Sequence, residues 1–232
     1  ELVWEYVEDY KTPSIFVINQ MDHQKADYDA ALEQLKNRFG SKVIPIQYPL
    51  NSGESFNQIV DALRMVMYEF PATGGKPEKK PIPESEMARA NEMHNALVEM
   101  AAENEEGLME KYFEEGNLSE EELAQGLMIG LAKHDFFPVF VASGAKDMGS
   151  GRIMGFIDDI APSPADRFGS KLENGEVLPC NAADKTTIFI YKTQSEPQVG
   201  VVSYFKVFSG EIKPGDELIN ANNGELERIS QI

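Results

Sequence analysis

The stretch SIFVINQMD, residues 14–22, decides the fold class, because an apolar run ends there in a polar turn. Its first five residues are mostly apolar and β-branched, which is typical of a strand buried on both faces in a parallel sheet. Helices are expected on either side of it, over residues 1–10 and 27–39, and another strand over 43–50. This alternation of strands and helices predicts an α/β domain.

A second apolar run, FPVFVA at residues 137–142, predicts another buried strand and leads into Ser143-Gly144-Ala145-Lys146. A helix is expected over 152–160. The segment APSP at 161–164 ends that helix, and its two prolines predict a domain boundary, with domains at 1–162 and 163–232.

The segment of about 45–135 differs in pattern from the sequence that flanks it. Strands are expected over 56–61 and 64–70, then a polar loop over 73–81. Three helices are expected after that loop, at 84–103, 107–115 and 119–133. Ser119, with Glu122 three residues later, is the signature of a capping box at the start of the third helix.

Beyond residue 163 the pattern is all β. Strands are expected over 186–192, 199–208 and 217–222, separated by glycine and proline turns. This predicts part of a β-barrel that is incomplete within the sequence, with at least one exposed strand edge.

The composition excludes several classes of protein. A net charge of −18 argues against extensive RNA binding by this chain, because an acidic surface repels phosphate. The single cysteine, Cys180, allows no disulfide within the chain and favours a reducing compartment. The sequence shows no signal peptide and no apolar run of the roughly 18 residues that a membrane span needs. A cytoplasmic location without membrane contact is expected.

Two polar turns follow the two buried strands and form the candidate site. Asp22 could accept hydrogen bonds from N1–H and the 2-amino group of guanine, which adenine does not offer, and Asn19 could hold the loop in place. Backbone N–H groups near Ser143 and Gly144 could donate to guanine O6. Each turn could instead be an ordinary connection after a strand. The chain contains no G-x-x-x-x-G-K-[ST] phosphate loop, and its one Asp-x-x-Gly match, at 166–169, follows no strand.

Residues 19–22, Asn-Gln-Met-Asp, resemble the N-K-x-D guanine motif of translational GTPases. The segments around them resemble elongation factor G in order along nearly the whole chain. The segments that carry this resemblance are 49–53, 108–113, 118–123, 138–143, 161–164 and 200–210. Two positions depart from the family: Gln20 replaces its lysine, and Gly144 replaces the alanine of its Ser-Ala pair.

The resemblance implies a partial sheet of the P-loop GTPase type in residues 1–162, interrupted by an α+β insert at about 45–135 and followed by the start of the barrel domain. It implies a GTP-driven factor that promotes ribosomal translocation, with GTP or GDP read by Asn19, Gln20, Asp22, Ser143 and Gly144. The phosphate loop, both switch regions and the Mg²⁺ contacts are expected before residue 1, so these residues alone should not hydrolyse GTP.

Two further expectations concern partners. The ribosome is the implied partner, and the acidic insert is expected to meet the ribosomal stalk protein. The two departures leave an alternative open, namely a ribosome-binding paralogue, either a protection or a regulatory factor, with weak or lost dependence on GTP.

Overall fold

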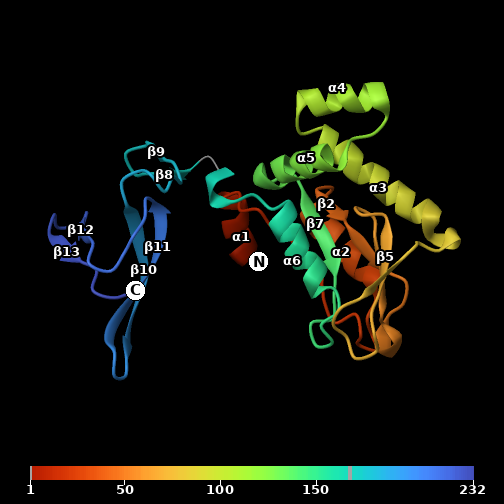
Figure 1. The fold of residues 1–232 in the computed structure, drawn as a ribbon, viewed down its shortest axis with the longest axis horizontal. Coiled ribbons are helices and arrows are strands. Elements are labelled where there is room, and N and C mark those ends of the chain that lie inside the picture. Colours follow the sequence, from red (N-terminus) through yellow and green to blue (C-terminus); the bar gives the residue numbers. More distant parts are fainter. Residues whose placement is uncertain (1, 167–168) are drawn as a thin grey trace. The chain divides into compact units, whose positions relative to one another are not determined.

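The computed structural model describes residues 2–166 and 169–232. The chain forms two compact units, one ending at Pro162 and the other spanning Ser163–Ile232, and each is described here by itself (Figure 1). The fold is mixed α/β, with a small parallel sheet, an antiparallel sheet and helices in the first unit and barrel-like strands in the second. Across residues 2–166 and 169–232, no helix is both long and apolar enough to cross a membrane.

A three-stranded parallel sheet forms the base of the first unit. Its strand order is β1 (Phe16–Ile18), β7 (Phe137–Val141), β2 (Val43–Pro45). All five residues of β7 are buried, which confirms the predicted buried strand. The strand expected over 14–18 is present as the shorter β1, but the prediction that it is buried on both faces is wrong, because β1 lies at the edge of this sheet and its Val17 is 42% exposed.

Alternate side chains of β7 enter two different cores, as the period of two in a strand requires. Phe137 and Val139 pack with aromatic residues near α1 (Leu2–Asp9) and α2 (Tyr28–Phe39). Phe140 packs instead against Phe156 of α6 (Ser150–Asp159), with ring centroids 5.0 Å apart.

The expected strand over 43–50 is wrong as a single element. It is divided at Ile46 into β2 and β3 (Gln47–Pro49), which belong to different sheets. The Ile46 N–H donates to the Val139 carbonyl at 2.9 Å, and the Ile46 carbonyl accepts from the Ala62 N–H at 2.9 Å. This buried residue therefore bonds to both sheets, which a run of apolar residues could not reveal.

The insert leaves the parallel sheet after β2 and returns to it at β7. Its antiparallel sheet has the order β3, β4 (Gln58–Asp61), β5 (Val66–Glu69), β6 (Glu78–Lys80). The strand β6 lies inside the segment expected to be a loop, 73–81. It is highly charged, and pairing with β5 rather than burial makes it a strand; Lys80 forms an ion pair with Glu69 there.

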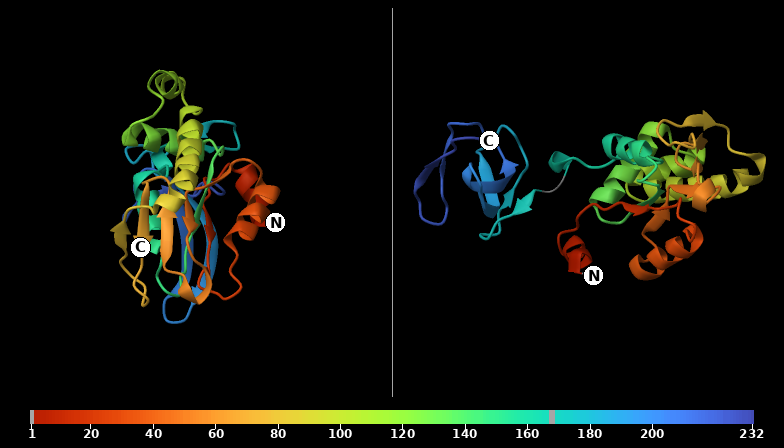
Figure 2. Two further views of the ribbon diagram at one scale, coloured as in Figure 1. Left: turned by 90° about the vertical axis from the view of Figure 1, so that its right-hand side faces the viewer. Right: turned by 90° about the horizontal axis from the view of Figure 1, so that it is seen from below.

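Three helices complete the insert: α3 (Met87–Ala102), α4 (Glu106–Glu115) and α5 (Glu120–Ala132). The predicted capping box is confirmed, since the side chains of Ser119 and Glu122 each accept from the other's backbone N–H. Gly126 allows α5 to approach α3, because a Cβ there would lie 2.5 Å from the Ala101 carbonyl oxygen. The views in Figures 1 and 2 place α4 at the outer end of the insert, away from the parallel sheet.

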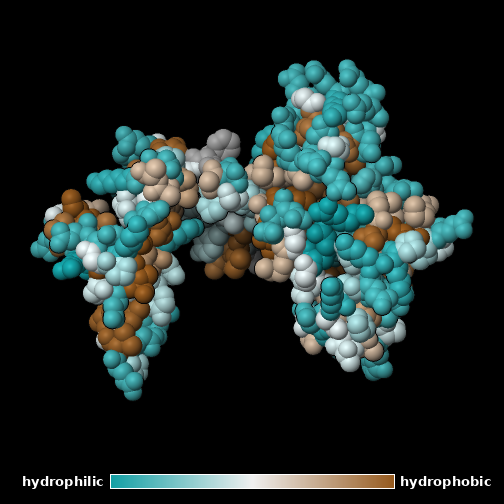
Figure 3. Space-filling model, in the orientation of Figure 1, coloured by the Kyte–Doolittle hydropathy of each residue, from teal (hydrophilic) through white to brown (hydrophobic). Residues whose placement is uncertain are grey.

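The second unit contains three two-stranded antiparallel sheets among its described residues, rather than a closed barrel. The strand pairs are β8 (Ser170–Lys171) with β9 (Val177–Leu178), β10 (Thr187–Glu196) with β11 (Gly200–Ser209), and β12 (Glu217–Ile219) with β13 (Leu226–Arg228). Apolar side chains of β10 and β11 are exposed, including Phe189 at 60% and Val201 at 75%, and hydrophobic atoms show on this unit in Figure 3. The Asp-x-x-Gly match at 166–169 includes residues 167–168, which lie outside the described residues.

Candidate functional site

Parallel pairing of β1 with β7 brings the two polar turns together. Ile18 lies opposite Val141 in the register, so both strands end at the same edge of the sheet. The contact continues past the strands, because the Ala142 N–H donates to the Ile18 carbonyl at 3.0 Å and the Met21 N–H donates to the Ala142 carbonyl at 3.2 Å. The carboxyl edge of a parallel sheet is where open α/β folds place their ligands.

Asn19 joins the two turns directly. Its Oδ1 accepts from the Gly144 N–H at 2.9 Å, a contact between residues 125 positions apart. The predicted tethering contact of Asn19 is therefore present in the structure. The same bond occupies the Gly144 N–H, which was one of the donors expected for guanine O6.

The neighbouring Ala145 N–H was not singled out by sequence reasoning. Among the hydrogen bonds of the described residues it takes part in none, whereas the Lys146 N–H is bonded to the Ser143 carbonyl at 3.3 Å. Ala145 is exposed, so its N–H is the backbone donor in this turn that is open to a ligand. No side-chain pattern marks it, because its role depends only on which N–H groups the turn leaves unbonded.

Asp22 and Ser143 interact across the two turns. A hydrogen bond from the buried Ser143 hydroxyl lowers the pKa of Asp22 below its usual 3.8, and the nearby charges of Lys146 and His23 act in the same direction. Asp22 is therefore a carboxylate at neutral pH, with acceptors only. That is the state needed to accept two N–H groups from one ligand edge.

Gln20 lies at the outer side of the site. Its backbone has φ of +60°, a left-handed conformation that is costly for a residue with a Cβ, and its carbonyl accepts from the His23 N–H at 2.9 Å. The side chain is exposed, and among the described residues it forms no hydrogen bond.

A short segment of the insert contacts the candidate site, which the sequence did not indicate. The Gly53 N–H donates to the Met21 carbonyl at 2.8 Å, and the Lys146 Nζ approaches the Glu54 carbonyl at 3.4 Å. Gln24 Nε2 also donates to the Glu54 carboxylate at 2.7 Å. The 3-10 helix Gly53–Ser55 thus contacts both turns.

The two turns thus contribute one carboxylate, that of Asp22, and one backbone N–H without a partner among the described residues, that of Ala145. Within the described ranges no cluster of three or more His, Cys, Asp or Glu side chains could hold a metal ion.

The fold is that of an α/β protein, and the candidate site lies at the carboxyl ends of two parallel strands. A solved structure from Thermus thermophilus, the protein ttk003000868, shares this fold with a TM-score of 0.80 and 26% sequence identity. The match covers 97% of this chain and 31% of that protein, so the chain spans about a third of its length. No family model matches the chain.

Proposed function

We propose that this chain is the guanine-recognising part of a translational GTPase similar to elongation factor G, which promotes ribosomal translocation. The observation that carries the proposal is the bond of Asn19 Oδ1 to the Gly144 N–H, which joins the two turns beside Asp22 and Ser143. The long alignment with a larger protein of the same fold is in keeping with a chain that performs one part of a larger task.

The chemistry of recognition follows from the groups at the site. The Asp22 carboxylate accepts from N1–H and the 2-amino group of guanine, and the open Ala145 N–H donates to O6. Adenine has an acceptor at N1 and no 2-amino group, so it would leave the carboxylate unpaired. An unpaired polar group at a bidentate contact costs about 1–3 kcal/mol, which supports a preference for guanine.

In this proposal the ligand is GTP or GDP, and the phosphates and their Mg²⁺ are held by residues outside this chain. The chain has no G-x-x-x-x-G-K-[ST] segment, so the positioning and charge stabilisation that phosphoryl transfer requires are absent from it. We therefore expect base recognition but no hydrolysis from these 232 residues.

The ribosome is the proposed partner, and the ribosomal stalk protein is proposed to dock on the acidic insert. Residues 84–135 contain fourteen Asp or Glu but three Lys or Arg, and hydrophilic atoms cover the outer end of the insert in Figure 3. The candidate contacts are five exposed carboxylates in α4 or just before it, Glu103, Glu105, Glu106, Glu114 and Glu115. Such a field attracts a basic protein and repels ribosomal RNA.

A second candidate is a ribosome-binding paralogue with little dependence on GTP. Gln20 favours it, because a glutamine reaches less far than a lysine and carries no charge to the ligand. The Gln20 side chain forms no hydrogen bond with the described residues that would hold it over a base. The two candidates differ in whether guanine is recognised at all.

Base specificity provides the test. GMP titrated into the isotope-labelled chain should shift the amide signals of residues 19–22 and 143–146, and AMP should not. Asp22→Asn should weaken the binding of GMP and strengthen that of XMP. Xanthine carries a carbonyl where guanine has the 2-amino group, and the asparagine amide can donate to that carbonyl. Asp158→Asn, at an exposed carboxylate of α6, is the matched control. Equal shifts with GMP and AMP would disprove guanine recognition, and the ribosome-binding paralogue would then be the remaining candidate.

A further inference from the structure

A pocket of about 700 Å³ lies in the first unit between α2 and α3, with β2 along one side. Its volume falls within the range of roughly 300–1,000 Å³ that small-molecule sites occupy. None of the candidate guanine contacts lines it. It is therefore separate from the proposed base site, although Asp27, the N-cap of α2, lies only five residues after Asp22.

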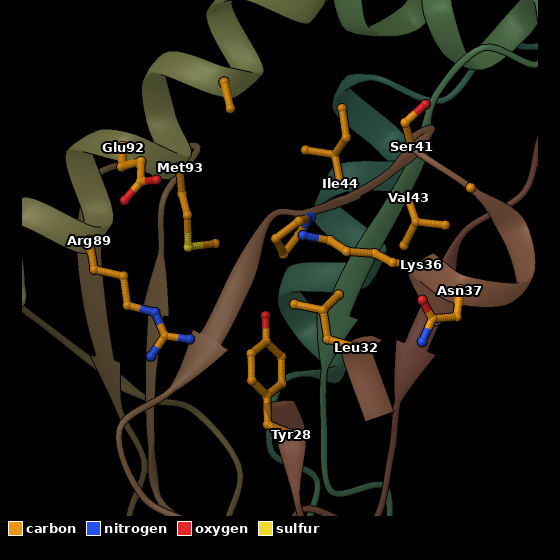
Figure 4. Close-up of a pocket in the computed structure, with 13 residues that line it drawn as sticks. Tyr28, Leu32, Lys36, Asn37, Ser41, Val43, Ile44, Arg89, Glu92 and Met93 are labelled. Carbon is orange, nitrogen blue, oxygen red and sulfur yellow. The ribbon is translucent and has the colours of Figure 1, made fainter. Parts of the chain in front are cut away.

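One side of the pocket is apolar. Leu32 from α2, Ile44 and Pro45 from β2, and Met93 from α3 line it, and each of these side chains is only partly buried by the protein. Figure 4 shows Leu32, Ile44 and Met93 around the same hollow. An apolar ligand chain placed there would remove this surface from water, which is favourable in proportion to the area covered.

Two cations stand at the polar side. In Figure 4 the Lys36 side chain extends from α2 toward α3, and Arg89 extends from α3 toward Tyr28. The Arg89 guanidinium lies over the Tyr48 ring, 4.2 Å from its centroid, and is 3.4 Å from the Asp29 carboxylate. The Tyr48 ring thus holds the Arg89 guanidinium in place, and the Asp29 carboxylate partly offsets its charge.

Lys36 is different. Within residues 2–166 and 169–232, its ammonium group has no ion pair or hydrogen bond. The Glu92 carboxylate also lines the pocket, but from α3, and no ion pair joins the two residues. In a chain with a net charge of −18, an unpaired ammonium group beside an apolar hollow is a specific complement to an anionic head group.

We propose that this pocket binds a small aliphatic carboxylate, with its chain along Leu32, Ile44 and Met93 and its carboxylate at Lys36. Such a ligand touches both α2 and α3. It would therefore couple the insert to the helix that follows the Asp22 turn. The inference does not depend on guanine recognition, because the two sites share no residue.

Octanoate is the probe, titrated into the isotope-labelled 232-residue chain and followed by the amide signals of α2 and α3. Saturable shifts are expected there, with hexanoate binding more weakly by up to about fourfold for each CH₂ removed. Octanol, which has the same chain without the charge, should bind less tightly than octanoate.

Two variants localise the binding. Lys36→Met keeps the apolar stem of the side chain. It should weaken octanoate binding about twofold to fivefold, as expected for the loss of an exposed ion pair, and leave octanol binding unchanged. Ala96→Phe, at an exposed lining position of α3, should fill the pocket and weaken both probes. Lys79→Met, at an exposed lysine of β6, is the control and should change neither.

Three results would overturn the proposal. The first is the absence of saturable shifts at α2 and α3. The second is octanoate binding that maps to the exposed apolar strands around Phe189 and Val201 instead. The third is equal binding of octanoate by the Lys36→Met variant and the unaltered chain.

Discussion

Arg152 Nε donates to Asp61 Oδ2 at 2.7 Å, which joins α6 to the insert sheet across 91 positions of the sequence. Asp61 is fully buried and the Arg152 side chain is 12% exposed. Gln47 Nε2 donates to the same carboxylate oxygen at 3.1 Å, and the Arg64 N–H donates to the other at 2.9 Å. The carboxylate therefore accepts hydrogen bonds from three segments of the chain, and the pair fixes the insert sheet against α6.

Arg152→Met should destabilise the chain by about 3–5 kcal/mol, because it leaves a buried carboxylate without its counter-ion. Chemical unfolding gives the difference in the free energy of unfolding. Arg64→Met is the control, since the ion pairs of the Arg64 side chain with Glu120 and Asp159 are exposed and worth about 0–1 kcal/mol. A similar small loss for both variants would show that the buried pair contributes little.

Gln20→Lys should tighten guanine-nucleotide binding by about tenfold, which corresponds to about 1.4 kcal/mol. The longer stem can lie along the base, where base stacking contributes roughly 1–3 kcal/mol in measured cases. Calorimetry with GDP is best made on a longer protein that also carries the phosphate contacts. Gln24→Lys, in the same turn, is the control, and an equal GDP affinity for Gln20→Lys and the unaltered protein would remove Gln20 from the explanation.

Gly144→Ala should stabilise the chain by about 0.4–1 kcal/mol, because it reduces the freedom of the unfolded chain. The φ of Gly144 is not positive, and a Cβ there would meet only the Asn19 side chain, at 3.6 Å. Gly149→Ala provides the contrast. With φ of +90° and a Cβ 2.5 Å from the Val141 carbonyl oxygen, it should destabilise. Thermal unfolding of both variants tests the pair, and a loss of stability in Gly144→Ala would refute this interpretation of the turn.

Glu122 should make the stability of the insert depend on pH. A hydrogen bond from Lys111, and those with Ser119, lower the pKa of Glu122 from 4.5 to about 2. Because the folded pKa lies below the unfolded one, the stabilisation is complete above about pH 4.5 and is lost as the pH falls toward 2. Glu122→Gln keeps an acceptor for the Ser119 N–H, so it should lower the melting temperature at neutral pH and have little effect near pH 2.

The control for that titration is Glu121→Gln, at the exposed neighbouring position, which should alter the melting temperature little at any pH. A Glu122→Gln difference that stays constant from neutral pH to pH 2 would contradict the electrostatic account. In that event the contribution of Glu122 would come from the capping geometry alone.

Charge reversal on the insert should abolish docking of the stalk-protein C-terminal domain at low salt. The attraction should also weaken in the unaltered chain as salt is added, because the Debye length is about 8 Å at physiological ionic strength. The reversed residues are Glu103, Glu105, Glu106, Glu114 and Glu115. The control reverses five exposed carboxylates of the second unit, Glu173, Glu176, Glu211, Glu225 and Glu227. Unchanged binding after reversal on the insert would leave its acidity as a solvated surface.

Local sequence determined the elements whose signals need no distant partner. The Ser119–Glu122 capping box forms within one helical turn, so its residue types are sufficient to predict it. The strand at 137–142 was predictable because its apolar run is continuous and it is buried on both faces. The polar turns at 19–22 and 143–146 were identifiable as a candidate site because each directly follows an apolar run in the sequence.

Only the tertiary structure decided which groups of that site meet and which remain open. The sequence could not show that Ile46 divides residues 43–50 between two sheets, or that pairing with β5 makes a strand of the charged segment β6, because both depend on backbone partners distant in the chain. Likewise, Asn19 occupies the Gly144 N–H and leaves that of Ala145 unbonded. Backbone N–H groups are identical in every residue but proline, so their availability is decided by the fold rather than by residue type.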